Sequence, residues 1–252
     1  MIVPWKRKAG LPGKEAYQYE SPADGKKPCA AGAGGHPLRH SRPGLFGLAD
    51  VHPGLEATPL DQKVKQVRAQ ESYTTFAELP ETYVDAVIAA EDHRFYQHNG
   101  IDVIAIGRAV VNDIKAMSFV EGGSTITQQL AKNLYFTQEK RLTRKVAEMF
   151  MAFHIEANYT KEEIFELYVN SIYFGSGCYD VASASQAYFG VEPSQMDANQ
   201  CTLLAGIPNA PSVYDLNVNP DLATQRQRQV LTLMVEHQYL TADQASAIQP
   251  AA

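Results

Sequence analysis

The chain has few cysteines and no long hydrophobic run. Its 252 residues include three cysteines, too few for the disulfide framework of a small secreted domain, and no Cys/His cluster has zinc-ligand spacing. Cys178 and Cys201 could pair, but we expect two unlinked thiols. No stretch approaches the ~18 apolar residues of a membrane span, and residues 1–30 lack the apolar core of a signal peptide. We therefore expect a soluble chain, or one whose anchor is absent from this sequence.

An excess of positive charge and strand-like alternation are also lacking. The formal net charge is −6 and the pI is near 5.6, which argues against nucleic acid as a partner. Few segments alternate apolar and polar residues as strands do, and we find no internal repeat. Since 45% of the residues are apolar, the chain can bury a sizeable core. We predict an all-α protein with one domain over residues 60–250.

The first fifth of the chain differs from the rest in composition. Residues 1–50 hold eight Gly and six Pro, and eight Lys and Arg stand against three Asp and Glu through residue 43. This composition predicts a basic, mostly disordered tail over residues 1–55. The tail could attach to an anionic membrane, or it could have no function.

The segment 91–100 (EDHRFYQHNG) places a carboxylate on the apolar face of a predicted helix. Loss of hydration there disfavours the charged form of Glu91 and should raise its pKa, which suits a proton acceptor near neutral pH. The alternative is a glutamate at the edge of the face that reaches water. The residues that share the face are Tyr83, Val84, Val87, Ile88, Glu91 and Phe95.

The segment 122–130 (GGSTITQQL) places a glycine turn before a second predicted helix. Thr125 and Gln128 have the spacing of a capping box. Unpaired amides at a helix start, together with the helix dipole, favour a bound anion. Gln128 and Lys132 lie one turn apart, opposite the apolar face, so we expect them to project into a cleft. The segment is therefore a candidate phosphate site.

Basic residues follow this helix within a short span. Such a run is either a solvated helix face or one side of an anion site. Between residues 132 and 145 only Glu139 opposes Lys132, Lys140, Arg141, Arg144 and Lys145.

Glu148 shares a helix face with two of these cations. It follows Arg144 by four positions and Arg141 by seven, and nearby cations favour an ionised carboxylate. The alternative is an ordinary surface ion pair. Two glutamates in opposite environments are typical of divided acid and base roles. In this helix, predicted over residues 142–158, the residues expected to face inward are Val146, Met149, Phe150 and Phe153.

Four ordered segments resemble the motifs of the peptidoglycan glycosyltransferase domain, found in penicillin-binding proteins and in monofunctional transglycosylases. The resemblance covers about residues 75–245. The segments are 91–100 (EDHRFYQHNG), 123–129 (GSTITQQ), 144–148 (RKVAE) and 161–170 (KEEIFELYVN), followed by 187–190 (AYFG) and 203–211 (LLAGIPNAP).

The resemblance implies a lysozyme-like helical fold and a specific reaction. A hydrophobic jaw, here near residues 103–121, would dip into the membrane. The family polymerises lipid II into β-1,4-linked glycan strands, with inversion and release of polyprenyl pyrophosphate. The first-motif glutamate, here Glu91, would deprotonate the acceptor's sugar 4-hydroxyl. Glu148 would assist the leaving pyrophosphate, through a divalent cation (Mg²⁺ or Mn²⁺) or by ordering nearby basic groups; no organic cofactor is implied.

Other residues at matching positions are expected to bind substrate. They are Asp92, Phe95, His98, Gly123, Ser124, Thr125, Gln128, Gln129, Lys132, Lys140, Arg141, Arg144, Lys145 and Asn170.

The chain also departs from the family pattern. Asp180 replaces a usual glycine, Val191 replaces a basic residue, and the arginine common before the third motif aligns with Lys140 or Arg141. We expect no counterpart of the family's amino-terminal membrane helix in this sequence, because the Gly/Pro-rich tail stands in its place. No Ser-x-x-Lys occurs, so the transpeptidase nucleophile motif is missing and we expect a monofunctional enzyme or an excised domain.

The implied partners are lipid II, the lipid-linked nascent glycan and the outer leaflet of the bacterial cytoplasmic membrane, with other cell-wall synthesis proteins possible and no nucleic acid. The implied location is the extracytoplasmic face of that membrane. One alternative is a lysozyme-like lytic enzyme, which needs one acidic glutamate but neither the basic run nor the glycine turn. Another is a non-catalytic cell-wall interaction domain, which would need neither glutamate.

Overall fold

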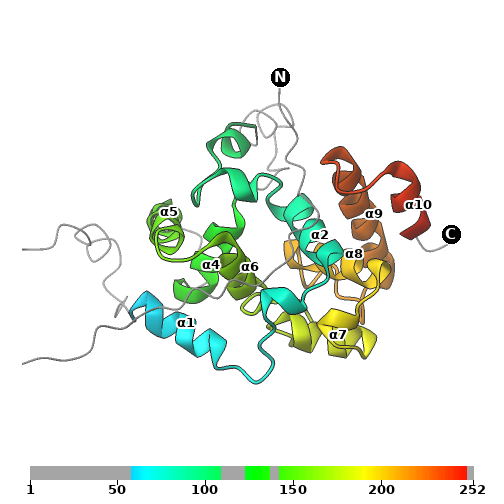
Figure 1. Cartoon of the computed structure of the whole chain (residues 1–252), viewed down its shortest axis with the longest axis horizontal. Helices are drawn as coiled ribbons and strands as arrows, with labels where there is room; N and C mark the ends of the chain where they lie inside the picture. The colour runs from blue at the N-terminus through cyan, green and yellow to red at the C-terminus, as the bar shows by residue number, and fades with distance from the viewer. Residues whose placement is uncertain (1–57, 109–122, 137–141, 249–252) are drawn as a thin grey trace, which may run out of the picture. The chain divides into compact units, whose positions relative to one another are not determined.

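The fold consists of helices joined by short loops (Figure 1). The computed structural model describes residues 58–108, 123–136 and 142–248, which belong to one compact unit, and every regular element within them is helical. This confirms the predicted all-α class. A helix also begins at residue 103 and is described to residue 108. The others are α1 (Leu60–Arg68), α2 (Glu81–Glu91), α4 (Ile126–Tyr135), α5 (Leu142–Glu156), α6 (Lys161–Val169), α7 (Val181–Phe189), α8 (Ala198–Gly206), α9 (Pro220–Glu236), α10 (Ala242–Ile248) and four 3-10 helices at Phe76–Glu78, Phe95–Gln97, Pro193–Gln195 and Ile207–Asn209.

Several predicted features lie outside the described residues. These are the tail over residues 1–55, Gly122, Lys140, Arg141 and most of the expected jaw at 103–121.

Two groups of helices share one hydrophobic core. α2 packs against α8 and α9, while α4 packs against α5 and α6. Large side chains from α2, from α6 and from the segments that follow these helices are fully buried in this core, where apolar burial stabilises the fold. The bulkiest of these side chains are Tyr83, Phe95, Phe165, Tyr168 and Phe174.

The capped helix starts predicted at Thr125, Thr160 and Asp197 are confirmed. Thr125 and Thr160 form capping boxes with Gln128 and Glu163, and Asp197 caps α8. Each cap satisfies amides that a helix start leaves unpaired.

Asp180 and Val191, two residues that depart from the family pattern, have structural roles. Asp180 caps α7, accepting hydrogen bonds from the amide and hydroxyl of Ser183, both at 2.7 Å. Val191 packs against the core, and its carbonyl accepts a hydrogen bond from Ser185. Gly190 ends α7 with a φ of 70°, a conformation that suits glycine.

α2 is shorter than its apolar pattern predicted. The pattern continued to Phe95, but the helix ends at Glu91, and Phe95 enters the core from a separate 3-10 turn. Glu91 therefore lies in the last turn of α2, where the helix dipole disfavours a negative charge.

The predicted phase of α5 is wrong. Val146, Phe150 and Phe153 were expected to face inward, but they are 48%, 60% and 49% exposed, whereas Glu148 is 2% exposed. Small residues, Ala147 and Ala152, face the core together with Ile155. The error arose because large apolar residues normally mark the buried face.

Gly100 and Glu156 tie the helices near the site together. Gly100 has a φ of 92°, and a side chain there would lie 3.1 Å from the Ala152 backbone. Glu156 Oε1 accepts hydrogen bonds from Thr127 Oγ1 at 2.6 Å and from Lys161 Nζ at 2.7 Å. α4, α5 and α6 are therefore fixed relative to one another beside the 91–100 segment.

Two expectations about the chain's chemistry can be compared with the fold. Cys178 and Cys201 are both buried and free, as expected. None of the helices in the described ranges combines the length and hydropathy that a membrane crossing requires.

Candidate active site

Glu91 has the environment of a proton acceptor. Its Oε2 accepts a hydrogen bond from Gln129 Nε2 at 2.8 Å, while its Oε1 is buried without a hydrogen-bond partner among the described residues. Burial raises the pKa of Glu91, against the lowering effects of the Gln129 hydrogen bond and of the charges of Arg226 and Lys132. A carboxyl group with a raised pKa and one unpaired oxygen can take a proton from a bound hydroxyl.

Gln129 is held at both ends of its amide. The carbonyl oxygen Oε1 accepts a hydrogen bond of 3.4 Å from the hydroxyl of Tyr168, a fully buried residue of α6. Tyr168, Gln129 and Glu91 thus form a chain that links α6, α4 and α2.

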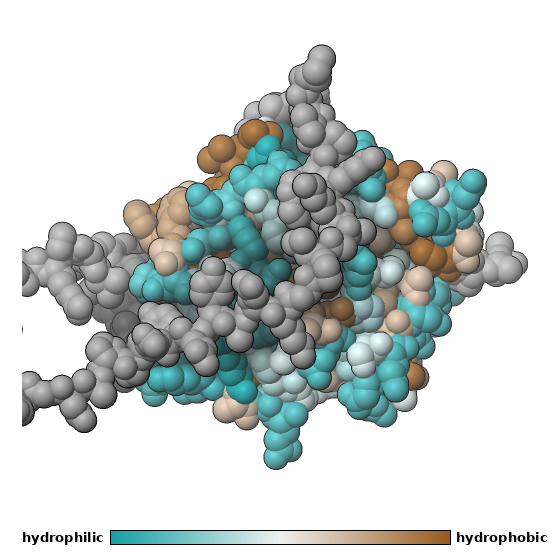
Figure 2. Space-filling model, in the orientation of Figure 1, coloured by the Kyte–Doolittle hydropathy of each residue, from teal (hydrophilic) through white to brown (hydrophobic). Residues whose placement is uncertain are grey.

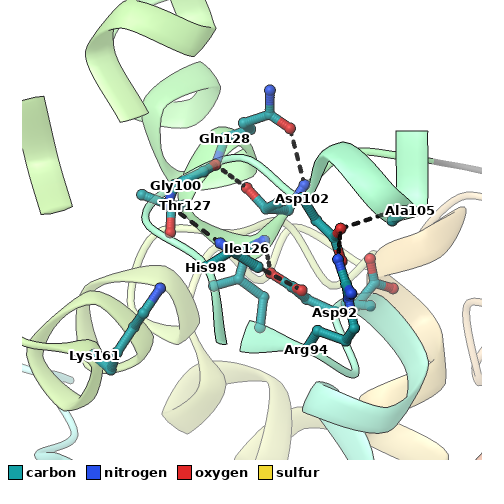
Figure 3. Close-up of polar contacts among 12 residues, drawn as sticks. Asp92, Arg94, His98, Gly100, Asp102, Ala105, Ile126, Thr127, Gln128 and Lys161 are labelled. Atoms are coloured by element: carbon teal, nitrogen blue, oxygen red, sulfur yellow. Dashed lines mark hydrogen bonds and ion pairs between the residues drawn. The ribbon is translucent and has the colours of Figure 1, made fainter. Parts of the chain in front are cut away.

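Asp92, next to Glu91, holds the fold rather than facing substrate (Figure 3). It is 6% exposed, and its carboxylate accepts hydrogen bonds from His98 Nε2 at 2.9 Å and from the Ile126 amide at 3.1 Å. The Gly100 amide donates to His98 Nδ1 at 3.2 Å, so the ring proton lies on Nε2, facing Asp92. The prediction that Asp92 and His98 bind substrate is therefore corrected to a bracing role.

Arg94 and Asp102 brace the other side of the same segment. Arg94 Nε donates to Asp102 Oδ2 at 2.7 Å, and the Ile104 and Ala105 amides donate to Asp102 Oδ1. Although burial raises the pKa of Asp102, Arg94 and these amides lower it to about 2. Asp102 caps the helix that begins at residue 103, as predicted.

Three of the amides that the prediction offered to a phosphate at the start of α4 are already paired within the protein. The amide of Thr125 donates to Gln128 Oε1, that of Gln128 donates to Thr125 Oγ1, and that of Ile126 donates to Asp92. The anion at this helix start is therefore the carboxylate of Asp92. Gln128 and Thr125 are 1% and 2% exposed, so Gln128 does not project into a cleft.

Basic side chains form an alternative anion site around Glu148. Its Oε1 lies 2.9 Å from Arg144 Nε, and its Oε2 lies 3.3 Å from Lys145 Nζ. Lys145 Nζ also donates to Ser124 Oγ at 2.8 Å, and Gly123 precedes Ser124 in the turn. The Lys145 side chain is 42% exposed, so its ammonium group can reach a phosphate while Glu148 holds it.

α4 connects the two carboxylates. Gln129 on α4 bonds to Glu91, and Ser124, five positions earlier, is linked through Lys145 to Glu148. A proton acceptor on α2 and a cationic anchor on α5 thus both contact the start of α4, one through Gln129 and the other through Ser124, which precedes the helix.

Two predicted substrate residues are internal. Phe95 is fully buried in the core. Asn170 is also fully buried, and its amide bonds to the Thr74 backbone at 2.9 and 2.7 Å and to the Glu166 carbonyl at 2.8 Å. Neither side chain can contact a ligand, so both predictions are corrected.

Sequence reasoning missed Tyr168 and Arg226. Arg226 lies on α9, and its charge lowers the pKa of Glu91. Its Nε is buried without a hydrogen-bond partner in the described structure. Nothing in the local pattern separates Arg226 from its neighbour Arg228, because only the packing of α9 on α2 brings one of them near Glu91.

The residues around Glu148 do not fit a divalent cation held by the protein. Both carboxylate oxygens already pair with cationic side chains, and no group of three or more His, Cys, Asp or Glu within the described ranges could hold a metal ion. Hard cations such as Mg²⁺ prefer several oxygen ligands.

Comparisons with known proteins agree on one family. The family model described as Transglycosylase matches residues 58–235. The chain is 42% identical over 206 residues to penicillin-binding protein 1A of Neisseria lactamica, covering 80% of this chain and 26% of that protein. It is 44% identical over 172 residues to penicillin-binding protein 1A of Aquifex aeolicus and 43% identical over 172 residues to penicillin-binding protein 1F of Bacillus subtilis, covering 68% of this chain and 24% of each protein.

The chain spans about a quarter of the length of these relatives. A crystal structure of penicillin-binding protein 1A from Haemophilus influenzae aligns with 71% of this chain and 18% of that one, at 19% identity and a TM-score of 0.41.

Proposed function

The chain belongs to the transglycosylase family and is a glycosyltransferase domain of the kind found in penicillin-binding proteins, and from this premise we propose that it polymerises lipid II into β-1,4-linked glycan strands. Two contacts near the α4 start carry the proposal: Gln129 bonds to Glu91, a carboxyl group with a raised pKa, and Ser124 belongs to the cationic anchor that it forms with Arg144 and Lys145. The product is a strand longer by one disaccharide and a free polyprenyl pyrophosphate.

Glu91 acts as the general base in this proposal. Its carboxylate takes the proton from the 4-hydroxyl of the acceptor sugar as that oxygen forms a bond to the anomeric carbon of the donor. The bond between the anomeric carbon and the pyrophosphate oxygen breaks, and the electron pair leaves with the pyrophosphate. A single displacement from the opposite face inverts the anomeric configuration.

Lys145 and Arg144 stabilise the negative charge that develops on the pyrophosphate. Fixed cations aimed at a developing charge contribute to catalysis because they need no reorganisation during the step. Glu148 positions both Arg144 and Lys145 by its ion pairs of 2.9 and 3.3 Å. The sequence left two roles open for Glu148: assisting the leaving pyrophosphate through a divalent cation, or ordering nearby basic groups. These contacts support the second role.

Exposed apolar residues suit a lipid-linked substrate. Val103 and Ile104, at the start of the expected jaw, are 74% and 63% exposed. The exposed apolar side chains of α5 add Val146 and Phe150, and Gly100 brings the chain before residue 103 against α5. Figure 2 shows hydrophobic residues over both regions, with hydrophilic residues between them. We propose that this surface meets the outer leaflet of the cytoplasmic membrane, where polyprenyl carriers reside.

The monofunctional character predicted from the sequence stays a prediction, because the relatives are much longer than this chain. The same holds for other cell-wall synthesis proteins as partners.

A polymerisation assay tests the proposed reaction. Purified protein incubated with labelled lipid II should yield long glycan strands, and Glu91→Gln should reduce the rate by about 10²–10⁴-fold, the usual contribution of a general base. The fold and lipid II binding should be unaffected. Glu71→Gln, at an exposed position, is the matched control. If Glu91→Gln polymerises at the wild-type rate, the base assignment is wrong.

The same preparation distinguishes the lytic alternative. Release of soluble fragments from preformed peptidoglycan, with no product from lipid II, would identify a lytic enzyme. Absence of both reactions would favour a non-catalytic domain.

Glu148→Gln tests the role of the second glutamate. It removes the charge that positions Arg144 and Lys145 and should lower turnover. Titrations with Mg²⁺ and Mn²⁺ in both proteins test for a cation: if the two profiles agree, Glu148 holds no metal ion.

A further inference from the structure

We propose that Tyr168 is a positioning residue for the base, its hydroxyl holding the amide of Gln129 so that the NH₂ group faces the ionised carboxylate of Glu91. The inference rests on the proposed function, because it assigns a residue to the reaction in which Glu91 is the base.

The contacts fix the amide of Gln129 at two points. Nε2 donates to Glu91 Oε2 at 2.8 Å, and Oε1 accepts from the Tyr168 hydroxyl at 3.4 Å. An amide held at one end only can turn about its last bond, whereas one held at both ends keeps its plane. A donor on the carbonyl oxygen also polarises the amide and strengthens the N–H that faces Glu91.

The burial of Tyr168 limits the hydrogen bonds that its hydroxyl can make. The residue is fully buried on α6, and a buried hydroxyl without a partner is destabilising. Burial raises the pKa of Tyr168 well above its ordinary value, and the charge of Glu91 adds to this. The hydroxyl therefore stays protonated, and it remains a donor throughout the pH range in which Glu91 titrates.

Electrostatics give the direction of the effect. The Gln129 hydrogen bond is the largest of the interactions that lower the pKa of Glu91 against its burial. If the Tyr168 hydroxyl is removed, the amide is held less firmly and the ionised carboxylate loses part of its stabilisation. The pKa of Glu91 should rise, so less of the base is ionised at acid pH.

Tyr83 provides a matched control. It is also fully buried, and its hydroxyl has no hydrogen-bond partner among the described residues. Tyr83→Phe and Tyr168→Phe thus remove the same atom from similar surroundings, but only the second breaks a bond to Gln129.

The experiment compares pH profiles of lipid II polymerisation for the wild type and the two variants. Tyr168→Phe should move the acid limb of kcat to higher pH, with a loss of about two- to fivefold on that limb, the size of one weak hydrogen bond. Activity on the alkaline side and KM should change little. In a Gln129→Ala background, adding Tyr168→Phe should have no further effect on the limb. Tyr83→Phe should leave the limb unmoved.

A purely structural role would give a different result. In that case Tyr168→Phe lowers Tm and leaves the acid limb in place, which overturns the inference. An equal shift for Tyr83→Phe overturns it as well.

A second readout does not depend on activity. Infrared difference spectra between each protein and its Glu91→Gln counterpart follow the carboxyl group of Glu91 through a pH titration. In the Tyr168→Phe variant the carboxyl group of Glu91 should titrate at higher pH than in the wild type. Coincident titrations of Glu91 in the two proteins contradict the inference. If the wild type fails to polymerise lipid II, the proposed function is refuted, while this titration still decides whether Tyr168 acts on Glu91.

Discussion

Replacing Asp92 by asparagine should destabilise the domain, because the carboxylate serves two donors at once. Oδ2 lies 2.9 Å from His98 Nε2 and 3.1 Å from the Ile126 amide, and Oδ1 lies 3.0 Å from His98 Nε2. Asparagine supplies one acceptor oxygen and one NH₂ group. Because both carboxylate oxygens of Asp92 face hydrogen-bond donors, the NH₂ group of asparagine would point at a donor. The substitution also removes a negative charge from the start of α4, where the helix dipole favours it.

The magnitude follows from these contacts. A hydrogen bond to a charged group contributes about 1.5–3 kcal/mol, and a charge at a helix start contributes about 0.3–1 kcal/mol. We expect a loss of about 2–4 kcal/mol, since Asp92 is 6% exposed and water can replace little of what is lost. For a domain of this size, 1 kcal/mol corresponds to about 2–4 °C in Tm, so Tm should fall by about 5–15 °C.

Thermal unfolding followed by circular dichroism measures this change. Asp61→Asn is the matched control, because the Asp61 side chain is 68% exposed and its ion pair within the described residues is with Lys65 at 3.5 Å; its Tm should stay within about 2 °C. If Asp92→Asn also unfolds within 2 °C of the wild type, the reasoning about the α4 start is refuted.

Three further predictions concern backbone shape, pH and surface. Gly100→Ala should lower the free energy of unfolding by about 1–3 kcal/mol in urea titrations, because its φ of 92° disfavours a side chain and α5 leaves no room for one; an unchanged midpoint would refute this. The rings of His93 and His237 stack at 4.2 Å, and burial lowers the pKa of both side chains. Because these two histidines bind protons more readily in the unfolded chain than in the folded one, Tm should fall as the pH drops below about 6.5. His237→Gln should flatten that dependence, and an equally steep fall would contradict it. Phe150→Ser should change stability by less than about 0.5 kcal/mol, whereas Phe165→Ala should cost about 3–5 kcal/mol; comparable losses would mean that α5 is oriented otherwise.

Local signals were sufficient for the helix starts. Thr125, Thr160 and Asp197 cap helices as predicted, because a cap depends on residues within one turn of it. The apolar setting of Glu91 also followed from the pattern, although α2 ends at that residue and the pattern continues to Phe95.

Properties that depend on packing were not predictable in this way. The phase of α5 is inverted because its small residues and Glu148 face the other helices, while Phe150 faces outward. The amides of α4 looked available for a phosphate, since nothing local indicates that Asp92, 34 positions earlier, accepts from Ile126. Tyr168 and Arg226 reach the site from helices distant in sequence.

Glu91 and Asp92 are neighbours in the chain but have separate tasks, one facing the reaction and the other holding α4. A mutational scan that scores protein abundance and product formation independently should therefore separate two adjacent acidic positions. Variants of Asp92 should be less abundant in the soluble fraction. Variants of Glu91 should accumulate as folded, inactive protein that still binds lipid II. Such variants would compete with the active enzyme for lipid II in the same cell.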